Sequence, residues 1–146
     1  ASTPENKQAR VILLDFRRSS RILRRLPNIW MYADNEERLI ETVNILKVEL
    51  KERVARLREE LEKQQNDDEL VGLREAPIVL VIDDYEQFTA LLRNPLNDLK
   101  EFFLQARDLR LHIIVAGSPS DLSKCDALLQ QVRVCRMGVV MGADPQ

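Results

Sequence analysis

The chain has 146 residues, a length that suits one domain with its own core and is too short for two. Apolar residues make up 45% of it and charged residues 32%, a balance typical of globular rather than disordered or fibrous proteins. No run approaches the roughly 18 apolar residues that cross a membrane, and the polar first residues do not resemble a secretory signal. Because the sequence does not begin with Met, we expect a piece of a longer polypeptide.

Two residue types that often carry chemistry are scarce. Cys125 and Cys135 stand ten residues apart with no C-x-x-C spacing, and His112 is the sole histidine. A four-ligand zinc site would need carboxylates to complete it, and a histidine-based triad would depend on that one imidazole. The sequence therefore favours two thiols in a reducing compartment, and we predict a cytoplasmic location.

The net charge of −2 hides an asymmetry between the two parts of the chain. Residues 1–34 carry seven basic and three acidic groups, a balance of +4, which leaves −6 for the remainder. Five arginines fall within nine positions: Arg17, Arg18, Arg21, Arg24 and Arg25. A phosphate-binding or partner-binding patch that includes Arg17, Arg18 and Arg21 is one interpretation. The solvated face of a short helix is the other, and the absence of interleaved aromatic residues favours it.

Four apolar runs predict buried strands, at residues 11–14, 78–82, 111–116 and 139–141. Uninterrupted apolar strands are typical of parallel sheets that are covered on both faces. Helical patterns separate the runs, so the fold class predicted is α/β, a mainly parallel four-stranded sheet with flanking helices.

A long helix is predicted over about residues 35–65, with Asp34 or Asn35 as its cap. Its leucines and valines recur about every 3.67 residues from Leu39 to Leu61, which suits a nearly straight helix. Such a helix is roughly 42 Å long, more than a domain of this size can cover, so its second half is expected to project. It would be either an arm for a partner helix or a solvated helix lying on its own domain. Shorter helices are predicted over residues 97–107 and 120–131.

Two acids, Asp83 and Asp84, directly follow the strand at residues 78–82. They fall at the carboxyl edge of the predicted sheet, where α/β proteins bind ligands. In P-loop nucleotide hydrolases the first such acid holds Mg²⁺ and the next residue orients the attacking water. Acids also simply end strands, so the pattern alone has low specificity. A phospho-acceptor receiver domain is excluded, because no acid follows the strand at residues 111–116.

Several motifs together resemble the FtsK/SpoIIIE ATPase superfamily, and more closely the carboxy-terminal, often degenerate ATPase modules of type VII secretion proteins EccC and EssC. The resemblance covers residues 10–146 and rests on Asp15-Phe16-Arg17-Arg18-Ser19, Asp83-Asp84-Tyr85, Ala106-Arg107 with the strand after it, and Gly142-Ala143-Asp144-Pro145. It implies one RecA-like domain over residues 1–146. It also implies that Asp83 is the metal-binding acid, Asp84 stands in for the catalytic glutamate, and Ser118 is a sensor-like residue. ATP and Mg²⁺ are the cofactors of the parent family.

The sequence departs from that family in one decisive respect. No G-x-x-x-x-G-K-[ST] loop occurs, and the glycines are Gly72, Gly117, Gly138 and Gly142. Without that loop no backbone N–H groups surround the β-phosphate and no lysine reaches the γ-phosphate, so we expect no cofactor and no hydrolysis by this chain alone. The family sheet runs 5-1-4-3-2, and its first strand carries the missing loop. Either the last strand closes up beside residues 111–116, or another chain supplies a strand.

The function expected is that of a non-hydrolysing module of an FtsK/SpoIIIE or type VII secretion ATPase, acting in docking, assembly or regulation. The partners implied are the rest of the parent ATPase, like subunits and the signal helices of secreted substrates. Two alternatives remain open. The chain could belong to an active translocase whose P-loop lies upstream, or it could bind nucleic acid through the cluster from Arg17 to Arg25.

Overall fold

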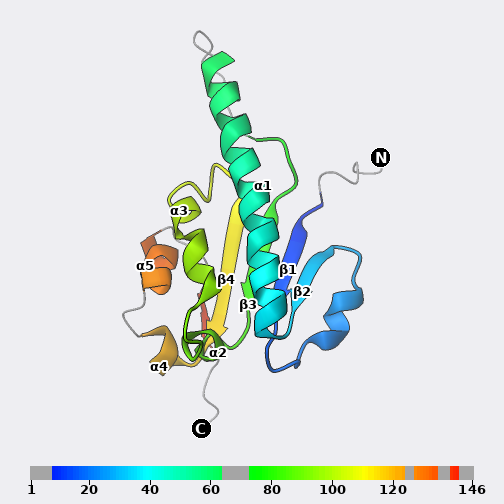
Figure 1. Ribbon diagram of the computed structural model, residues 1–146, viewed down its shortest axis with the longest axis vertical. Helices are drawn as coiled ribbons and strands as arrows, with labels where there is room; N and C mark the ends of the chain where they lie inside the picture. Colours follow the sequence, from blue (N-terminus) through cyan, green and yellow to red (C-terminus); the bar gives the residue numbers. More distant parts are fainter. Residues whose placement is uncertain (1–7, 64–72, 124–126, 135–138, 142–146) are drawn as a thin grey trace.

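A five-stranded, fully parallel sheet forms the centre of the computed structural model, which describes residues 8–63, 73–123, 127–134 and 139–141. Its order is β2-β1-β3-β4-β5 (Figure 1). The strands are β1 (Arg10–Leu14), β2 (Ile29–Ala33), β3 (Ile78–Ile82), β4 (Leu111–Gly117) and β5 (Val139–Met141). The α/β class, the parallel pairing and all four predicted strands are confirmed, and β2 is an additional strand.

The strand beside β4 shows how the sheet is completed without the P-loop strand of the family. β5 pairs directly with β4, and Val139 lies opposite Val115. Of the two alternatives, closure of the last strand onto residues 111–116 is therefore the one observed.

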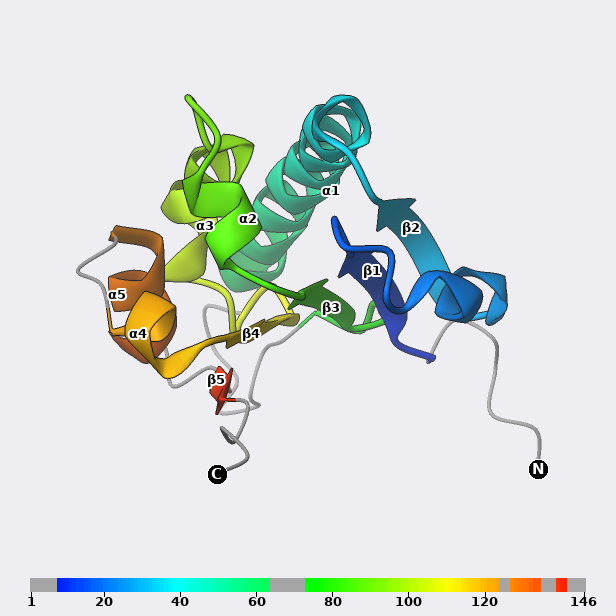
Figure 2. The same cartoon turned by 90° about the horizontal axis from the view of Figure 1, so that it is seen from below.

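One long helix and several short ones accompany the sheet. They are α1 (Glu36–Lys63), α2 (Glu86–Thr89), α3 (Lys100–Phe103), α4 (Pro119–Leu122) and α5 (Ala127–Val134), with 3₁₀ turns η2 (Arg21–Arg25) and η3 (Pro95–Leu99). The predictions for residues 97–107 and 120–131 were wrong in extent. The first segment is η3 followed by α3, and the second is divided between α4 and α5. Figure 2 shows α1, α2 and α3 together on one face of the sheet.

The long helix α1 has the 28 residues that the leucine spacing predicts. Leu39, Val43, Leu46 and Leu50 are buried in the core, whereas Leu61 is 57% exposed. Figure 1 shows the carboxyl end of α1 extending beyond the sheet. Among the described residues, no helix is long and apolar enough to cross a membrane.

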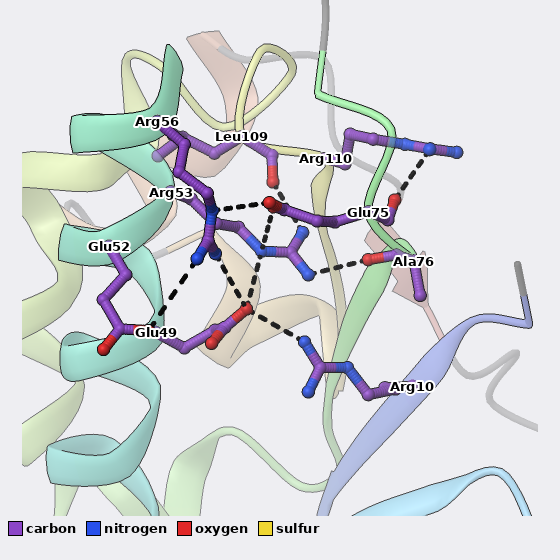
Figure 3. A network of polar contacts seen from close by, with 9 residues as sticks. All are labelled: Arg10, Glu49, Glu52, Arg53, Arg56, Glu75, Ala76, Leu109 and Arg110. Carbon is purple, nitrogen blue, oxygen red and sulfur yellow. Dashed lines mark hydrogen bonds and ion pairs between the residues drawn. The ribbon is translucent and has the colours of Figure 1, made fainter. Parts of the chain in front are cut away.

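A polar network fixes α1 to the amino edge of the sheet (Figure 3). Its centre is Arg53, whose side chain is fully buried. The Arg53 guanidinium donates to the Leu109 carbonyl at 2.9 Å, to the Ala76 carbonyl at 2.8 Å and to Glu49 at 3.0 Å. Ala76 and Leu109 lead into β3 and β4, so this one side chain holds the helix against the start of both strands.

Candidate functional site at the carboxyl edge of the sheet

Three neighbouring strands end in polar residues at one edge of the sheet. Asp15 follows β1, Asp83 follows β3 and Ser118 follows β4. Because the strands are parallel, these residues share an edge, the one at which the sequence analysis expected Asp83 and Asp84. The backbone holds the loop after β3 to both neighbours: Asp83 N donates to the Leu14 carbonyl and Tyr85 N to the Ala116 carbonyl, each at 3.0 Å.

Asp15 is a buried carboxylate that organises the loop after β1. It has no exposed surface, yet it accepts hydrogen bonds from Ser19 N at 3.0 Å, Ser20 N at 2.9 Å and Tyr32 Oη at 2.9 Å. Burial of the Tyr32 phenol, helped by its hydrogen bond to Asp15, raises the pKa of Tyr32 to about 12. Sequence reasoning gave Asp15 no role. The sequence feature that could have indicated this role is an acid directly after a buried strand, with two serines shortly downstream. Such residues are typical of turns in which a side chain accepts hydrogen bonds from nearby backbone N–H groups.

Asp83, the predicted metal-binding acid, joins the same network. It accepts a hydrogen bond from Ser19 Oγ at 3.2 Å, and Ser19 Oγ lies 3.3 Å from Asp15. One hydroxyl therefore connects the loop after β1 with the loop after β3.

Asp84, the predicted counterpart of the catalytic glutamate, is paired with an arginine of the chain itself. Arg17 Nε lies 3.1 Å from the Asp84 carboxylate, and the same guanidinium contacts Glu86. The Asp84 backbone is left-handed, with φ of 53°. This arrangement directs the acid toward the β1 loop, and sequence reasoning did not foresee the pairing.

The other predicted site residues have other partners. Ser118 caps α4: its Oγ accepts from Asp121 N at 3.3 Å and also contacts the Asp121 carboxylate. Arg18 pairs with Asp34, at 3.1 Å, beyond the end of β2. Arg21 lies in η2 and is exposed. Of the arginine cluster, only Arg17 is paired with the acids that follow β3.

Both predicted acids already have partners within the chain. The Arg17 guanidinium forms an ion pair with the Asp84 carboxylate, and the Ser19 hydroxyl lies within hydrogen-bond distance of both Asp83 and Asp15. Across the described part of the chain, no group of three or more potential metal ligands forms. Local ion pairs and hydrogen bonds therefore account for the polar contacts of this edge.

Comparison with known proteins relates the whole fold to one kind of ATPase. No protein-family model matches the chain. The EccC protein of the ESX secretion system from Thermomonospora curvata is 36% identical over 72 residues, which are 47% of this chain and 5% of that protein. A structure of ATPases 2 and 3 of T. curvata EccC, in complex with a signal sequence peptide, matches with a TM-score of 0.72 and 27% identity over 96% of this chain.

Other solved structures agree on the fold. The cytoplasmic domain of the T. curvata EccC type VII secretion ATPase matches 91% of this chain with a TM-score of 0.69 and 26% identity. EssC ATPases 2 and 3 from Geobacillus thermodenitrificans share the fold at 16% identity, with a TM-score of 0.62. The chain spans 15–26% of these three solved chains. The chain is thus similar in sequence to EccC, and in fold to the ATPase domains of the type VII secretion proteins EccC and EssC.

Proposed function

We propose that the chain is a non-hydrolysing ATPase-like module of a type VII secretion ATPase, and that it acts through docking, assembly or regulation. The observation that carries this proposal is the Arg17 ion pair with Asp84, at 3.1 Å, extended by the contact with Glu86. An acid that orients water must face the phosphate, and this one faces a cation of its own chain.

The sequence supports the same conclusion from the phosphate side. Phosphoryl transfer depends on preorganised donors around the β- and γ-phosphates, and the glycine-rich loop with its lysine is absent from the 146 residues. Asp83 and Ser118 are then best explained as structural residues, one bridging two loops and the other capping α4.

Its partners would be the rest of a multidomain ATPase, like subunits and substrate signal helices, in the cytoplasm. The structure of a similar EccC protein contains two ATPases and a signal sequence peptide, which supports this choice of partners.

Titration with a fluorescent ATP analogue, with and without Mg²⁺, tests the proposal, together with a phosphate-release assay. We expect neither saturable Mg²⁺-dependent binding nor phosphate release above the buffer rate. An active P-loop ATPase assayed in parallel is the positive control. Micromolar Mg²⁺-dependent binding that is lost in Asp83→Asn would contradict the proposal, because it would show a working metal-binding acid.

A further inference from the structure

The short 3₁₀ turn η2 and the residue after it present both basic and apolar side chains to solvent. We call these six residues, Arg21 to Leu26, the η2 patch. Ile22 is 76% exposed, Leu23 42% and Leu26 48%. The three arginines of the same segment are exposed as well. Figures 1 and 2 both show η2, the blue turn of helix, at the outer margin of the molecule beyond β2.

The arginines of the η2 patch form no ion pair within the described residues, although the charge of Arg21 acts on the nearby Tyr32 phenol. None of Arg21, Arg24 and Arg25 forms an ion pair with a carboxylate of the described residues, whereas Arg17 and Arg18 both do. Exposing three large apolar side chains together on one protruding turn is unfavourable in water, and burying them against an apolar partner would be favourable. Within the described residues, the patch thus combines arginines that form no ion pair with apolar side chains that are exposed to solvent.

We propose that the η2 patch contacts the surface of an anionic lipid bilayer. Arginines there gain from the negative headgroup potential, while isoleucine and leucine enter the boundary with the acyl chains. A nucleic acid would engage the arginines but leave the three apolar side chains in water. A protein partner would require a complementary groove around a convex turn, whereas a fluid bilayer adapts to its shape. The proposal goes beyond the proposed function, and does not depend on whether the chain binds nucleotide.

Co-sedimentation of the full chain with lipid vesicles tests the electrostatic part of the proposal. The chain should bind vesicles of phosphatidylglycerol and phosphatidylcholine in equal parts, bind pure phosphatidylcholine weakly, and dissociate as salt is raised. The double variant Arg24→Gln/Arg25→Gln should bind the anionic vesicles about 30-fold more weakly, at about fivefold per arginine. The matched control is Arg93→Gln/Arg107→Gln, which removes the same charge from exposed positions elsewhere and should bind like the parent chain.

A second pair of variants tests the apolar contribution. Ile22→Ser should weaken binding to anionic vesicles about tenfold, while Ile40→Ser, at an isoleucine of α1 that is 45% exposed, should leave it unchanged. All six substituted positions are exposed, and circular dichroism checks that the variants fold.

Several results would overturn the proposal. One is the absence of binding to anionic vesicles at low salt. Another is a loss of affinity in the Arg93→Gln/Arg107→Gln control equal to that in the Arg24→Gln/Arg25→Gln variant. A third is an Ile22→Ser variant that binds like the parent chain. If the parent chain did not bind vesicles but retarded duplex DNA in a gel, the patch would be assigned to nucleic-acid binding instead. If it did not bind vesicles but self-associated through Arg24 and Arg25, the patch would be assigned to an interface between copies of the chain.

Discussion

The backbone of Asp84 is left-handed, a conformation that side chains with a branched β-carbon rarely adopt. Its φ is 53°, and Arg18 on the facing loop has φ of 58°. Asp and Asn tolerate this region better than other non-glycine residues, because their short polar side chains bond locally. Each of the two loops linked by Arg17 therefore holds one left-handed residue, and the third such residue in the described part of the chain, Arg110, precedes β4.

Substitutions at Asp84 separate the backbone effect from the ion pair. Asp84→Asn and Asp84→Val both abolish the charge that Arg17 contacts, but only valine opposes the left-handed backbone. We expect Asp84→Val to lower the free energy of unfolding by about 1–2 kcal/mol more than Asp84→Asn, as measured by urea denaturation. Asp108→Val, at an exposed position outside the left-handed region, is the control and should change stability by less than about 0.5 kcal/mol. Equal stability of the valine and asparagine variants would contradict the left-handed assignment.

At the residue scale, the sequence predicted positions better than it predicted contacts. Asp83 and Asp84 were expected at the carboxyl edge because they directly follow an apolar strand, whereas Ser118 was named only through the family resemblance. The Arg17–Asp84 pair and the role of Asp15 could not be predicted in this way. Both depend on which loop side chains meet across neighbouring strands, which only the folded chain determines.

At the scale of helices and strands, the spacing of apolar residues predicted the long helix correctly. It did not predict the extents of the shorter helices, where the chain changes direction often. The spacing from Leu39 to Leu61 predicts α1 closely, because every buried turn repeats the same signal. Pro95 opens a 3₁₀ turn before α3, which breaks the helix expected over residues 97–107. Strand β2 was missed because it is an edge strand in which only Ala33 is fully buried, although Ile29, Trp30 and Tyr32 favour strands.

The contrast between Arg53 and Arg56 tests what anchors α1. Arg53→Met would leave two carbonyls, those of Ala76 and Leu109, without their buried donor. It would also remove one of the two arginines that lie 3.0 Å from Glu49. We expect a loss of about 3–5 kcal/mol in the free energy of unfolding. Arg56, one turn along and 42% exposed, pairs with Glu75 at 2.5 Å, and Arg56→Met should cost no more than about 1 kcal/mol. Equal costs for the two variants in chemical denaturation would refute the anchoring role of Arg53.

For the molecule as a whole, the apolar strands predicted a sheet covered on both faces. Ile12, Leu80 and Ile113, on the face toward the core, are almost fully buried. On the opposite face, Val79 and Ile114 are only half-buried. The hydrophobic pattern of a strand records that both faces are apolar, but it carries no information on which segment covers each face. The parallel α/β class could therefore be predicted, while the distribution of its helices could not.

The stability of the whole fold should depend on pH through Glu49, which joins α1 to the amino edge of the sheet. Burial raises its pKa, but hydrogen bonds and charge from Arg53 and Arg10 outweigh burial, so the pKa lies below the ordinary 4.5. A depressed carboxyl pKa contributes stability that is complete above the unfolded pKa and is lost as the pH falls through the folded one. The stability advantage of the parent chain over Glu49→Gln should therefore be full above pH 4.5 and shrink below it, in urea denaturation at a series of pH values. The control is Glu52→Gln, at an exposed position one turn away, whose difference in free energy of unfolding from the parent chain should be small and change little with pH. If the difference between the parent chain and Glu49→Gln instead grew as the pH fell, the lowered pKa of Glu49 would be refuted.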